Sequence, residues 1–284
     1  MTTDPLVIVG AGVMGTGIAA LALGHGTPVV LVDVSPGVLD RARALIRSQL
    51  RHGQLMGAFP DGVSAGELST AETVPTGLRP AAAIEAVVED ADTKAKVLAE
   101  LSEKIPPGVP LITNTSSIPL TELAGPLERP AELVGVHFMN PAYLVRMTEL
   151  VKGARTGEAT VAATTALLNG WGRRVVPVRD APGFVTSRLL HPMINDAARI
   201  VGAGTAGPEE VDALMEGCLG HRTGPLRTAD LIGLDNLADS LRVLAERTGN
   251  AGYRPCELLL AKVAQGHLGR KSGRGFYEYG DELS

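Results

Sequence analysis

The sequence predicts an α/β fold, in which a doubly wound parallel sheet is followed by a second, all-helical domain. Short apolar runs alternate with helical segments as far as residue 180, which is typical of a parallel sheet covered on both faces. Beyond APGF, which ends at residue 184, the segments look helical until the last few residues. A length of 284 residues suits two ordinary domains. We therefore expect one domain over residues 1–183 and a helical domain over residues 184–284.

The expected strands are short apolar runs bounded by turn-forming residues. They cover residues 6–9, 28–33, 82–89, 109–117, 133–139, 147–153 and 173–180. The first two runs, LVIV and PVVLVD, lack alternation with polar residues, as strands of a parallel sheet buried on both faces do. The last run, RRVVPVRD, is expected at an edge of the sheet.

The expected helices follow from apolar residues at helical intervals. In the first domain they include an Ala-rich helix that begins in the glycine-rich turn after residue 9 and ends near residue 24, and helices over 36–51, 93–105 and about 157–171. In the second domain they cover 185–202, 208–217, 227–248 and 255–266. Residues 52–82 are rich in Gly, Pro and Thr, so a loop or a weak excursion is expected there.

Composition argues against several classes of protein. The net charge is −5 and no basic stripe is present, so a nucleic-acid partner is not expected. No apolar run reaches the roughly 20 residues that span a bilayer. Cys218 and Cys256 form no CxxC motif, no secretory leader is recognisable and no metal-ligand motif is found. We therefore expect a cytoplasmic protein without a bound metal, a membrane span or a nucleic-acid partner.

A glycine-rich turn predicts a nucleotide site. Gly10, Gly12 and Gly15 form G-x-G-x-x-G directly after a strand and at the start of a helix. This context fits a Rossmann-like domain, in which the glycines allow a tight turn, close approach of a diphosphate and helix–strand packing. The whole turn is a candidate cofactor contact and includes Ala11, Val13 and Met14. The alternative is a glycine-rich turn that binds nothing.

Asp33 indicates which dinucleotide is bound. It ends the second strand, 18 positions after the last glycine, where a carboxylate can accept hydrogen bonds from the adenosine ribose hydroxyls. The carboxylate would repel a 2′-phosphate, and Val34, Ser35 and Pro36 offer no cation. The sequence therefore predicts NAD rather than NADP.

His137 is the candidate for acid–base chemistry. It ends or follows a predicted strand, and polar residues that include Ser116 and Asn140 follow the ends of neighbouring strands, where open parallel sheets bind ligands. Glu149 lies 12 positions later, near the start of the next strand. A carboxylate beside an imidazole fixes its tautomer and raises its basicity, as proton abstraction from an alcohol requires. The alternative is a core histidine bonded to a backbone carbonyl.

Together these motifs resemble the 3-hydroxyacyl-CoA dehydrogenase family, including the short bacterial 3-hydroxybutyryl-CoA dehydrogenases. The resemblance covers nearly the whole chain and is carried by VIVGAGVMGTGIA, VVLVD, IEAVVED, NTSSI, GVHFMNP, APGFVTSRLL, TGPL, IGLDN and LGRKSGRGFYEY. It implies an NAD-binding Rossmann domain over 1–183, a helical substrate and dimerisation domain over 184–284, and a homodimer. The implied activity is NAD-dependent oxidation of a 3-hydroxyacyl thioester, or the reverse reduction.

The resemblance also implies roles for individual residues. His137 matches the catalytic histidine and Glu149 its partner carboxylate, while Ser116 and Asn140 match residues that hold the substrate oxygen and the cofactor. Cofactor contacts are implied for three further residues, Glu89, Lys94 and Lys271. Without the resemblance, Glu89 and Lys94 would be interpreted as an ordinary ion pair at a solvated helix start.

The chain departs from the family pattern at three places. Ser187, a candidate substrate contact, stands where the family usually has Asn, and residues 221–225 read HRTGP instead of the usual Pro-Met-Gly-Pro. No lysine occurs between residues 41 and 93, where the family carries lysines for CoA phosphates. Arginine can bind phosphate in their place, and four are available, Arg41, Arg43, Arg47 and Arg51.

These departures leave the substrate open. The acyl group could be carried by CoA, or by an acyl carrier protein, as in a glyceryl-like thioester of polyketide extender-unit biosynthesis. A dehydrogenase of a free hydroxy acid or sugar acid is a further alternative. An inactive NAD-binding structural protein is the alternative from outside the enzymes. The acyl chain and the physiological direction are not specified by the sequence.

Overall fold

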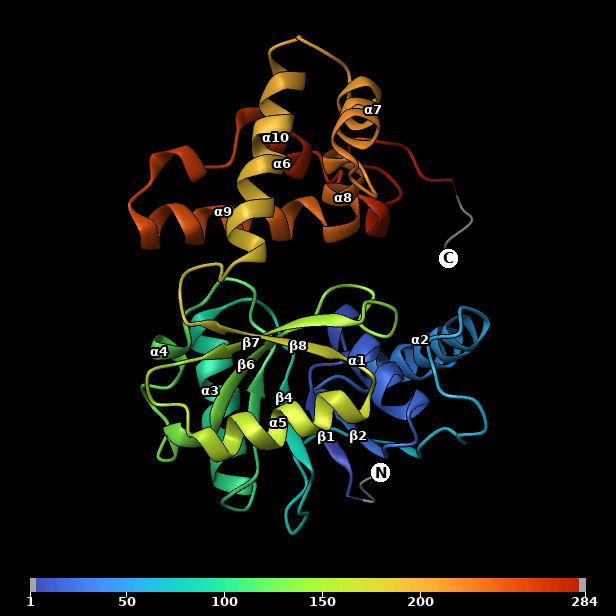
Figure 1. The fold of residues 1–284 in the computed structure, drawn as a ribbon, viewed down its shortest axis with the longest axis vertical. Coiled ribbons are helices and arrows are strands. Elements are labelled where there is room, and N and C mark those ends of the chain that lie inside the picture. The colour runs from blue at the N-terminus through green and yellow to red at the C-terminus, as the bar shows by residue number, and fades with distance from the viewer. Residues whose placement is uncertain (1–3, 281–284) are drawn as a thin grey trace. The chain divides into compact units, whose positions relative to one another are not determined.

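The computed structural model describes residues 4–280, which form two compact units. The first unit ends at Ala181 and the second begins at Pro182. Within the described residues, all strands of the sheet belong to the first unit, and the second unit is built from helices and two isolated β-bridges. The predicted fold class, an α/β sheet domain with a second helical domain, is confirmed (Figure 1).

The sheet of the first unit has eight strands among the described residues. They are β1 (Leu6–Val9), β2 (Val29–Val32), β3 (Leu68–Ala71), β4 (Ala82–Glu85), β5 (Leu111–Thr113), β6 (Leu133–His137), β7 (Met147–Lys152) and β8 (Arg174–Arg179). Their spatial order is β3-β2-β1-β4-β5-β6-β7-β8. The chain therefore winds outward from β1 in both directions, and β1 lies at the switch point where open α/β sheets bind ligands.

Two features of the sheet differ from the prediction. The stretch 52–82 contains β3, which pairs parallel to β2 at the edge; its sequence LSTA is half polar and so gives little strand signal. The second difference is that β7 runs antiparallel to β6. Only residues 138–146 connect these strands, which is too short for the crossover of a dozen or more residues that a parallel pair needs. The predicted doubly wound parallel sheet is therefore confirmed as a mainly parallel sheet in which one pair, β6 with β7, is antiparallel, and the edge position of β8 is confirmed.

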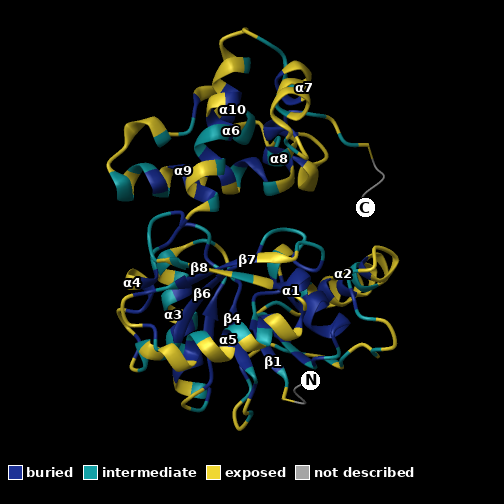
Figure 2. Cartoon of the chain, viewed as in Figure 1, coloured by how far each residue is buried: buried dark blue, intermediate teal, exposed yellow. Residues whose placement is uncertain are grey.

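Helices cover both faces of the sheet. They are α1 (Val13–Gly24), α2 (Pro36–Leu55), α3 (Ala91–Lys104), α4 (Leu120–Leu123) and α5 (Glu158–Gly170). One apolar cluster joins α1, α2 and α5 to alternate residues of the strands, and a second joins α3 and α4 to the residues between them. The central strands are consequently buried on both faces, as the unbroken apolar runs predict (Figure 2).

The second unit contains the helices α6 (Thr186–Gly202), α7 (Pro208–Leu219), α8 (Pro225–Ile232), α9 (Leu234–Thr248) and α10 (Glu257–Ala264). The helix expected over 227–248 is two helices, because Gly233 between them has a φ of 97°, which ordinary L-residues rarely adopt. The core of the unit includes Leu226, Leu237 and Leu241, all fully buried. No helix within residues 4–280 is long and apolar enough to cross a membrane.

Candidate active site

The glycine-rich turn joins β1 to α1. Gly10 has a φ of 104°, and a Cβ at this position would lie 2.5 Å from the backbone oxygen of Ala86. A Cβ on Gly15 would lie 1.8 Å from the oxygen of Gly10, so this glycine allows the helix to pack on the turn. A Cβ on Gly12 would meet no atom of the described residues within 4 Å. Gly12 therefore faces open space, where a ligand can approach the backbone at the start of α1.

The start of α1 is suited to an anion. Its first turn, residues 13–16, carries no acidic side chain, and the backbone N–H groups of a helix start have no partner within the helix. Val13 and Met14 belong to this first turn, and Ala11 directly precedes Gly12. A diphosphate at this position would receive hydrogen bonds from backbone donors and a favourable helix dipole.

Asp33 lies beside this turn. Its Oδ2 accepts a hydrogen bond from the Ala11 backbone N–H at 3.0 Å, and its Oδ1 accepts one from the Ser35 N–H at 3.1 Å. The carboxylate is therefore held between the first and second strands at the carboxyl edge of the sheet. It remains half-buried, and the neighbouring Val34 is 86% exposed. The open glycine and the fixed carboxylate fit a dinucleotide with free ribose hydroxyls.

His137 and Glu149 form a buried hydrogen-bonded pair. They are directly opposite each other in the antiparallel register of β6 and β7, and Nδ1 of His137 lies 2.8 Å from Oε2 of Glu149. The two residues are 8% and 6% exposed. A carboxylate at this distance favours the tautomer with the proton on Nδ1, which makes Nε2 the proton-accepting ring atom. The pair can therefore act as an oriented general base.

The turn after β5 is held by Glu89. Its Oε1 accepts hydrogen bonds from the backbone N–H groups of Ser116 and Ser117, at 2.7 and 2.9 Å, and from the hydroxyl of Thr115 at 2.7 Å. The hydroxyls of both serines also donate to this oxygen. Burial opposes the ionisation of Glu89, but the charge of Lys94 and the hydrogen bonds of Thr115 and the two serines outweigh it and lower its pKa. We refer to residues 114–117 as the serine turn.

The serine turn also contacts the strand that carries His137. The side-chain oxygen of Asn114 accepts a hydrogen bond from the backbone N–H of Phe138 at 3.1 Å. Ser116 is thus held on a turn that is tied to the residue after His137. Asn140 lies three positions beyond His137, is half-buried, and precedes Pro141 in a cis peptide bond.

Lys94 is the least exposed cation among the predicted site residues. It is 1% exposed and lies between two carboxylates, 2.7 Å from Oε1 of Glu85 and 3.3 Å from Oε2 of Glu89. The interpretation of Glu89 and Lys94 as a solvated surface pair is therefore wrong for Lys94. Sequence reasoning missed Glu85, although a carboxylate inside the buried strand AAIE requires a partner and could have indicated one.

Ser187 and Lys271 belong to the second unit. Ser187 lies in the first turn of α6 and is 2% exposed. Lys271 lies in a 3₁₀ turn, Arg270–Ser272, and its Nζ is 2.6 Å from Oδ2 of Asp235. Their predicted roles toward substrate and cofactor stay predictions.

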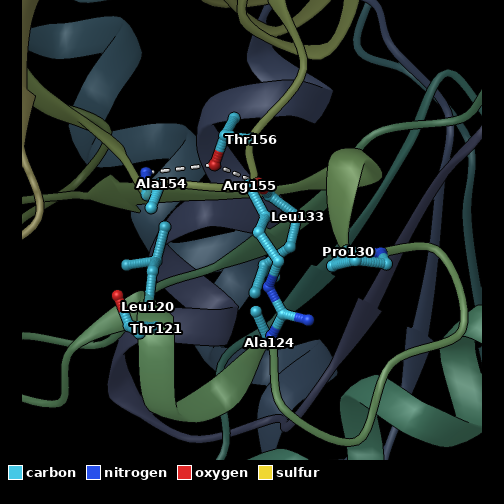
Figure 3. A pocket seen from close by; sticks show the side chains of 9 residues that line it. Leu120, Thr121, Ala124, Pro130, Leu133, Ala154, Arg155 and Thr156 are labelled. Carbon is cyan, nitrogen blue, oxygen red and sulfur yellow. Dashed lines mark hydrogen bonds between the residues drawn. The ribbon is translucent and has the colours of Figure 1, made fainter.

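Two cavities of the first unit lie away from these residues. One cavity, of about 260 Å³, is lined by Leu133, Arg155 and Thr156 among other residues (Figure 3). Leu133 is the first residue of β6, whereas His137 is its last, so this cavity lies at the other end of the strand. The Thr156 hydroxyl accepts from the Gly153 N–H and donates to the Leu133 oxygen, so its polar group is already satisfied. Another cavity, of about 390 Å³, is lined by residues of α5 and by Trp171. Neither lining includes a predicted site residue.

The fold and the site define a two-domain, nucleotide-dependent oxidoreductase: a dinucleotide turn and an oriented histidine base lie at the carboxyl ends of strands in one sheet. The profile described as "3-hydroxyacyl-CoA dehydrogenase, NAD binding domain" matches residues 5–181, and the one described as "3-hydroxyacyl-CoA dehydrogenase, C-terminal domain" matches residues 183–279. The chain belongs to the 3-hydroxyacyl-CoA dehydrogenase family. The NAD binding domain of this family also confirms the predicted cofactor, NAD.

Relatives of known name support the same assignment. A "Probable 3-hydroxybutyryl-CoA dehydrogenase" of Bacillus subtilis is 37% identical over the full length of both chains. A "3-hydroxybutyryl-CoA dehydrogenase" of Bradyrhizobium diazoefficiens is 38% identical over 96% of this chain and 94% of that protein. Among solved structures, (S)-3-hydroxybutyryl-CoA dehydrogenase PaaH1 from Ralstonia eutropha is similar, with a TM-score of 0.86, 36% identity and coverage of 99% and 100%. FadB2 of Mycobacterium tuberculosis gives a TM-score of 0.90 at 34% identity, with coverage of 98% and 100%.

Proposed function

We propose that this protein oxidises a 3-hydroxyacyl thioester to the 3-oxoacyl thioester with NAD, or catalyses the reverse reduction. The observation that carries the proposal is the buried His137–Glu149 pair, at 2.8 Å, at the end of a strand in the sheet that also holds the glycine turn. NAD supplies the hydride acceptor when it is bound. The steps that follow are those of the chain's own residues.

The glycine turn and Asp33 hold the two polar ends of the dinucleotide's adenosine half. The backbone N–H groups from Gly12 to Gly15, at the start of α1, would bind the diphosphate, and the Asp33 carboxylate would accept from the ribose hydroxyls. Asp33 is already fixed by the Ala11 and Ser35 N–H groups, so its orientation does not depend on the ligand. This preorganisation favours binding, because little side-chain freedom remains to be lost.

His137 takes the proton of the substrate's 3-hydroxyl at Nε2 during oxidation. Glu149 holds the ring through Nδ1 and stabilises the imidazolium that forms, because a negative charge lies next to it in a buried site. In the reverse direction the imidazolium returns the proton to the oxygen. Ser116 and Asn140 hold this oxygen as donors. The Ser116 hydroxyl donates a hydrogen bond to Glu89 at 3.1 Å, and rotation of this hydroxyl can turn its proton toward a substrate. The Ser116 backbone N–H meanwhile stays bound to Glu89 at 2.7 Å.

The test is the variant His137→Gln, assayed for NADH formation with 3-hydroxybutyryl-CoA. General acid–base help contributes roughly 10²- to 10⁴-fold, so turnover should fall by that factor. The Kd for NAD, measured by calorimetry, should stay within about twofold, because the glycine turn and Asp33 are unchanged. Full activity of the variant would refute the role of His137. An inactive wild type would count against this substrate class and favour a free hydroxy acid or a non-enzymatic NAD-binding protein.

A second candidate substrate, the same acyl group on an acidic carrier protein, is favoured by one observation on α2. Arg41, Arg47 and Arg51 are exposed and make no ion pair or side-chain hydrogen bond within the described part of the chain. Leu55 and Met56, at the end of the helix, are 86% and 61% exposed. Exposed arginines next to apolar side chains suit an acidic protein surface, since Arg and Met are enriched at interfaces.

The position of α2 is suited to such a partner. Nδ1 of His52, near the end of α2, lies 2.9 Å from the Tyr143 hydroxyl, which belongs to the loop that follows His137. A carrier on the exposed face of α2 would therefore present its pantetheine arm near this loop. We expect Arg47→Glu together with Arg51→Glu to raise the KM for a carrier-bound hydroxyacyl group at least tenfold and to leave its CoA thioester within about threefold. Equal effects on both substrates would instead indicate that these arginines bind the CoA phosphates.

We also propose a homodimer formed by the second unit. Its support is the family assignment and the exposure of Leu189, Leu214 and Leu219, at 70%, 59% and 67%. Apolar side chains of this size on one unit favour association. Sedimentation equilibrium tests it: a single species of the 29.5 kDa chain mass would contradict the dimer.

A further inference from the structure

Glu85, the last residue of β4, is a carboxylate with no exposed surface. Its Oε1 accepts from the Lys94 ammonium at 2.7 Å and from the Val87 N–H at 2.8 Å, and its Oε2 accepts from the Thr113 hydroxyl at 2.6 Å. A buried charge is costly unless it is paired and hydrogen-bonded, and here both oxygens are used. Glu85 is therefore built into the ends of β4 and β5 by contacts to both of its oxygens.

The contacts of Glu85 continue to the serine turn. Lys94 forms its second ion pair with Oε2 of Glu89, at 3.3 Å. The other oxygen of Glu89 accepts all the hydrogen bonds from the serine turn, including 2.7 Å from the Ser116 N–H. An unbroken series of charge-assisted contacts thus runs from Glu85 through Lys94 and Glu89 to Ser116.

The contacts of Glu85 also reach the glycine turn. Val87, whose N–H it binds, follows Ala86, and the Ala86 N–H donates to the Val9 oxygen at 2.8 Å. The backbone of Ala86 and Val87 lies against Gly10, within 2.9 Å of where a Cβ would be. This backbone forms one wall of the glycine turn. Glu85 therefore lies between the turn proposed to bind the diphosphate and the turn that carries Ser116.

We propose that Glu85 is a positioning residue for the reaction, which fixes the serine turn through Lys94 and Glu89 and supports the glycine turn through Val87. The inference rests on the proposed function and adds a residue that touches neither substrate nor cofactor. If Glu85 becomes an amide, Lys94 faces a single carboxylate. Lys94 is then drawn toward Glu89, and the hydrogen bonds from Glu89 to the serine turn weaken.

The test compares Glu85→Gln with Glu132→Gln as a matched control. Glu132 is also a paired carboxylate that holds a loop: it accepts from the Gly108 N–H at 2.7 Å and from Arg129 at 2.8 Å, but it has no contact with the serine turn. Two quantities are measured at a temperature where circular dichroism shows both variants folded. They are kcat for NADH formation, and hydrogen exchange of the peptide that contains Ser116 and Ser117.

In Glu85→Gln we expect kcat to fall by about 10- to 100-fold, because a misplacement of order 1 Å at a reacting site costs up to roughly that factor. Exchange of the Ser116 and Ser117 amides should become at least about tenfold faster. Glu132→Gln should change neither quantity by more than about twofold. A lower unfolding temperature for Glu85→Gln with kcat and exchange unchanged would overturn the proposal, because Glu85 would then contribute to stability only.

Hydrogen exchange separates this inference from the proposed function. If the wild type does not oxidise hydroxyacyl thioesters, the proposed function fails, and faster exchange in Glu85→Gln still supports the link from Glu85 to the serine turn. If Glu85→Gln does not fold, Glu85→Asp replaces it. This change keeps the charge but draws the carboxylate away from Lys94 and Thr113, and it leaves intact the Thr113 hydroxyl, which also accepts from the Thr115 N–H of the serine turn at 3.4 Å. We then expect kcat to fall about two- to fivefold with faster exchange of the serine turn, and no change in either would refute the proposal.

Discussion

Glu149→Gln isolates the charge of the buried pair from its hydrogen bond. Glutamine has nearly the shape of glutamate, and its amide oxygen can still accept from Nδ1 of His137 across the 2.8 Å contact. What the change removes is the negative charge beside the ring when the imidazolium forms. The strand register, which places the two side chains directly opposite each other, is unaffected.

The size of the effect follows from the separation of the charges. With the charge centres about 4 Å apart and an effective dielectric of about 20, their attraction is about 4 kcal/mol. That energy corresponds to a factor of roughly 10³ in rate. The retained hydrogen bond is worth about 1 kcal/mol, so the expected loss in kcat is roughly 10²- to 10³-fold.

The assay is steady-state NADH formation, with the NAD affinity measured separately. Thr148→Val is the control, because Thr148 precedes Glu149 in β7 and is 2% exposed, and its hydroxyl has no hydrogen-bond partner among residues 4–280. It should keep kcat within about threefold. Adding Glu149→Gln to His137→Gln should cost little more, since residues that act as a unit are not additive. A Glu149→Gln enzyme with kcat within threefold of wild type would refute the reasoning.

Three further results are expected. Asp33→Ser combined with Val34→Arg should reverse the preference from NAD to NADP, because it removes the carboxylate and adds a cation. The ratio of kcat/KM with NAD to kcat/KM with NADP should change at least tenfold. An unchanged ratio would exclude Asp33 as the ribose contact. Gly12→Ala should fold normally, since its Cβ enters open space, and should bind NAD at least tenfold more weakly, because that space is where the diphosphate is proposed to approach the backbone. Gly15→Ala should lower the unfolding temperature, since its Cβ would lie 1.8 Å from the Gly10 oxygen. Equal unfolding temperatures of the two variants would contradict this. Folding lowers the pKa of Glu89, so the stability that its carboxylate contributes is present above pH 4.5, its ordinary pKa, and is lost as the pH falls through the lowered pKa. Glu89→Gln should therefore flatten the acid side of the curve of unfolding free energy against pH, measured by urea unfolding. A slope identical to that of the wild type would refute this.

The sequence predicts those parts of the fold that have a strong local signal. The strands LVIV and VVLV are apolar throughout, and the glycine turn has fixed spacing, so both were predictable. The strand LSTA lacks such a signal because an edge strand need not be apolar on both faces. Likewise, the break at Gly233 was missed because a single glycine within a helical pattern does not by itself show whether its φ is positive.

Some residues of the candidate site could likewise be predicted from local motifs, whereas others could not. Residues that belong to short motifs, such as Asp33 and His137, could be predicted from the sequence, and their roles stay predictions. Glu85 was missed because its importance lies in contacts across 9 and 28 positions, to Lys94 and Thr113, which only the pairing of β4 with β5 and the packing of α3 bring together. Its one sequence signal was a carboxylate inside an otherwise apolar strand. Such a residue calls for a buried cation, and a lysine in the following helix was available.

The antiparallel direction of β7 explains why two residues 12 positions apart, His137 and Glu149, form a buried hydrogen-bonded pair. A parallel return would need a crossover longer than the connection 138–146, so only a reversal lets β7 pair with β6 directly. Reversal places residues 137 and 149 opposite each other, where Cβ atoms are about 4.5–5.5 Å apart and a hydrogen bond can form. Side chains alternate between faces, so a slip of one residue would turn Glu149 away and bring Thr148 or Leu150 opposite His137. The proposed chemistry therefore depends on the register of this one strand pair, and the short connection, which carries Asn140, is part of what fixes that register.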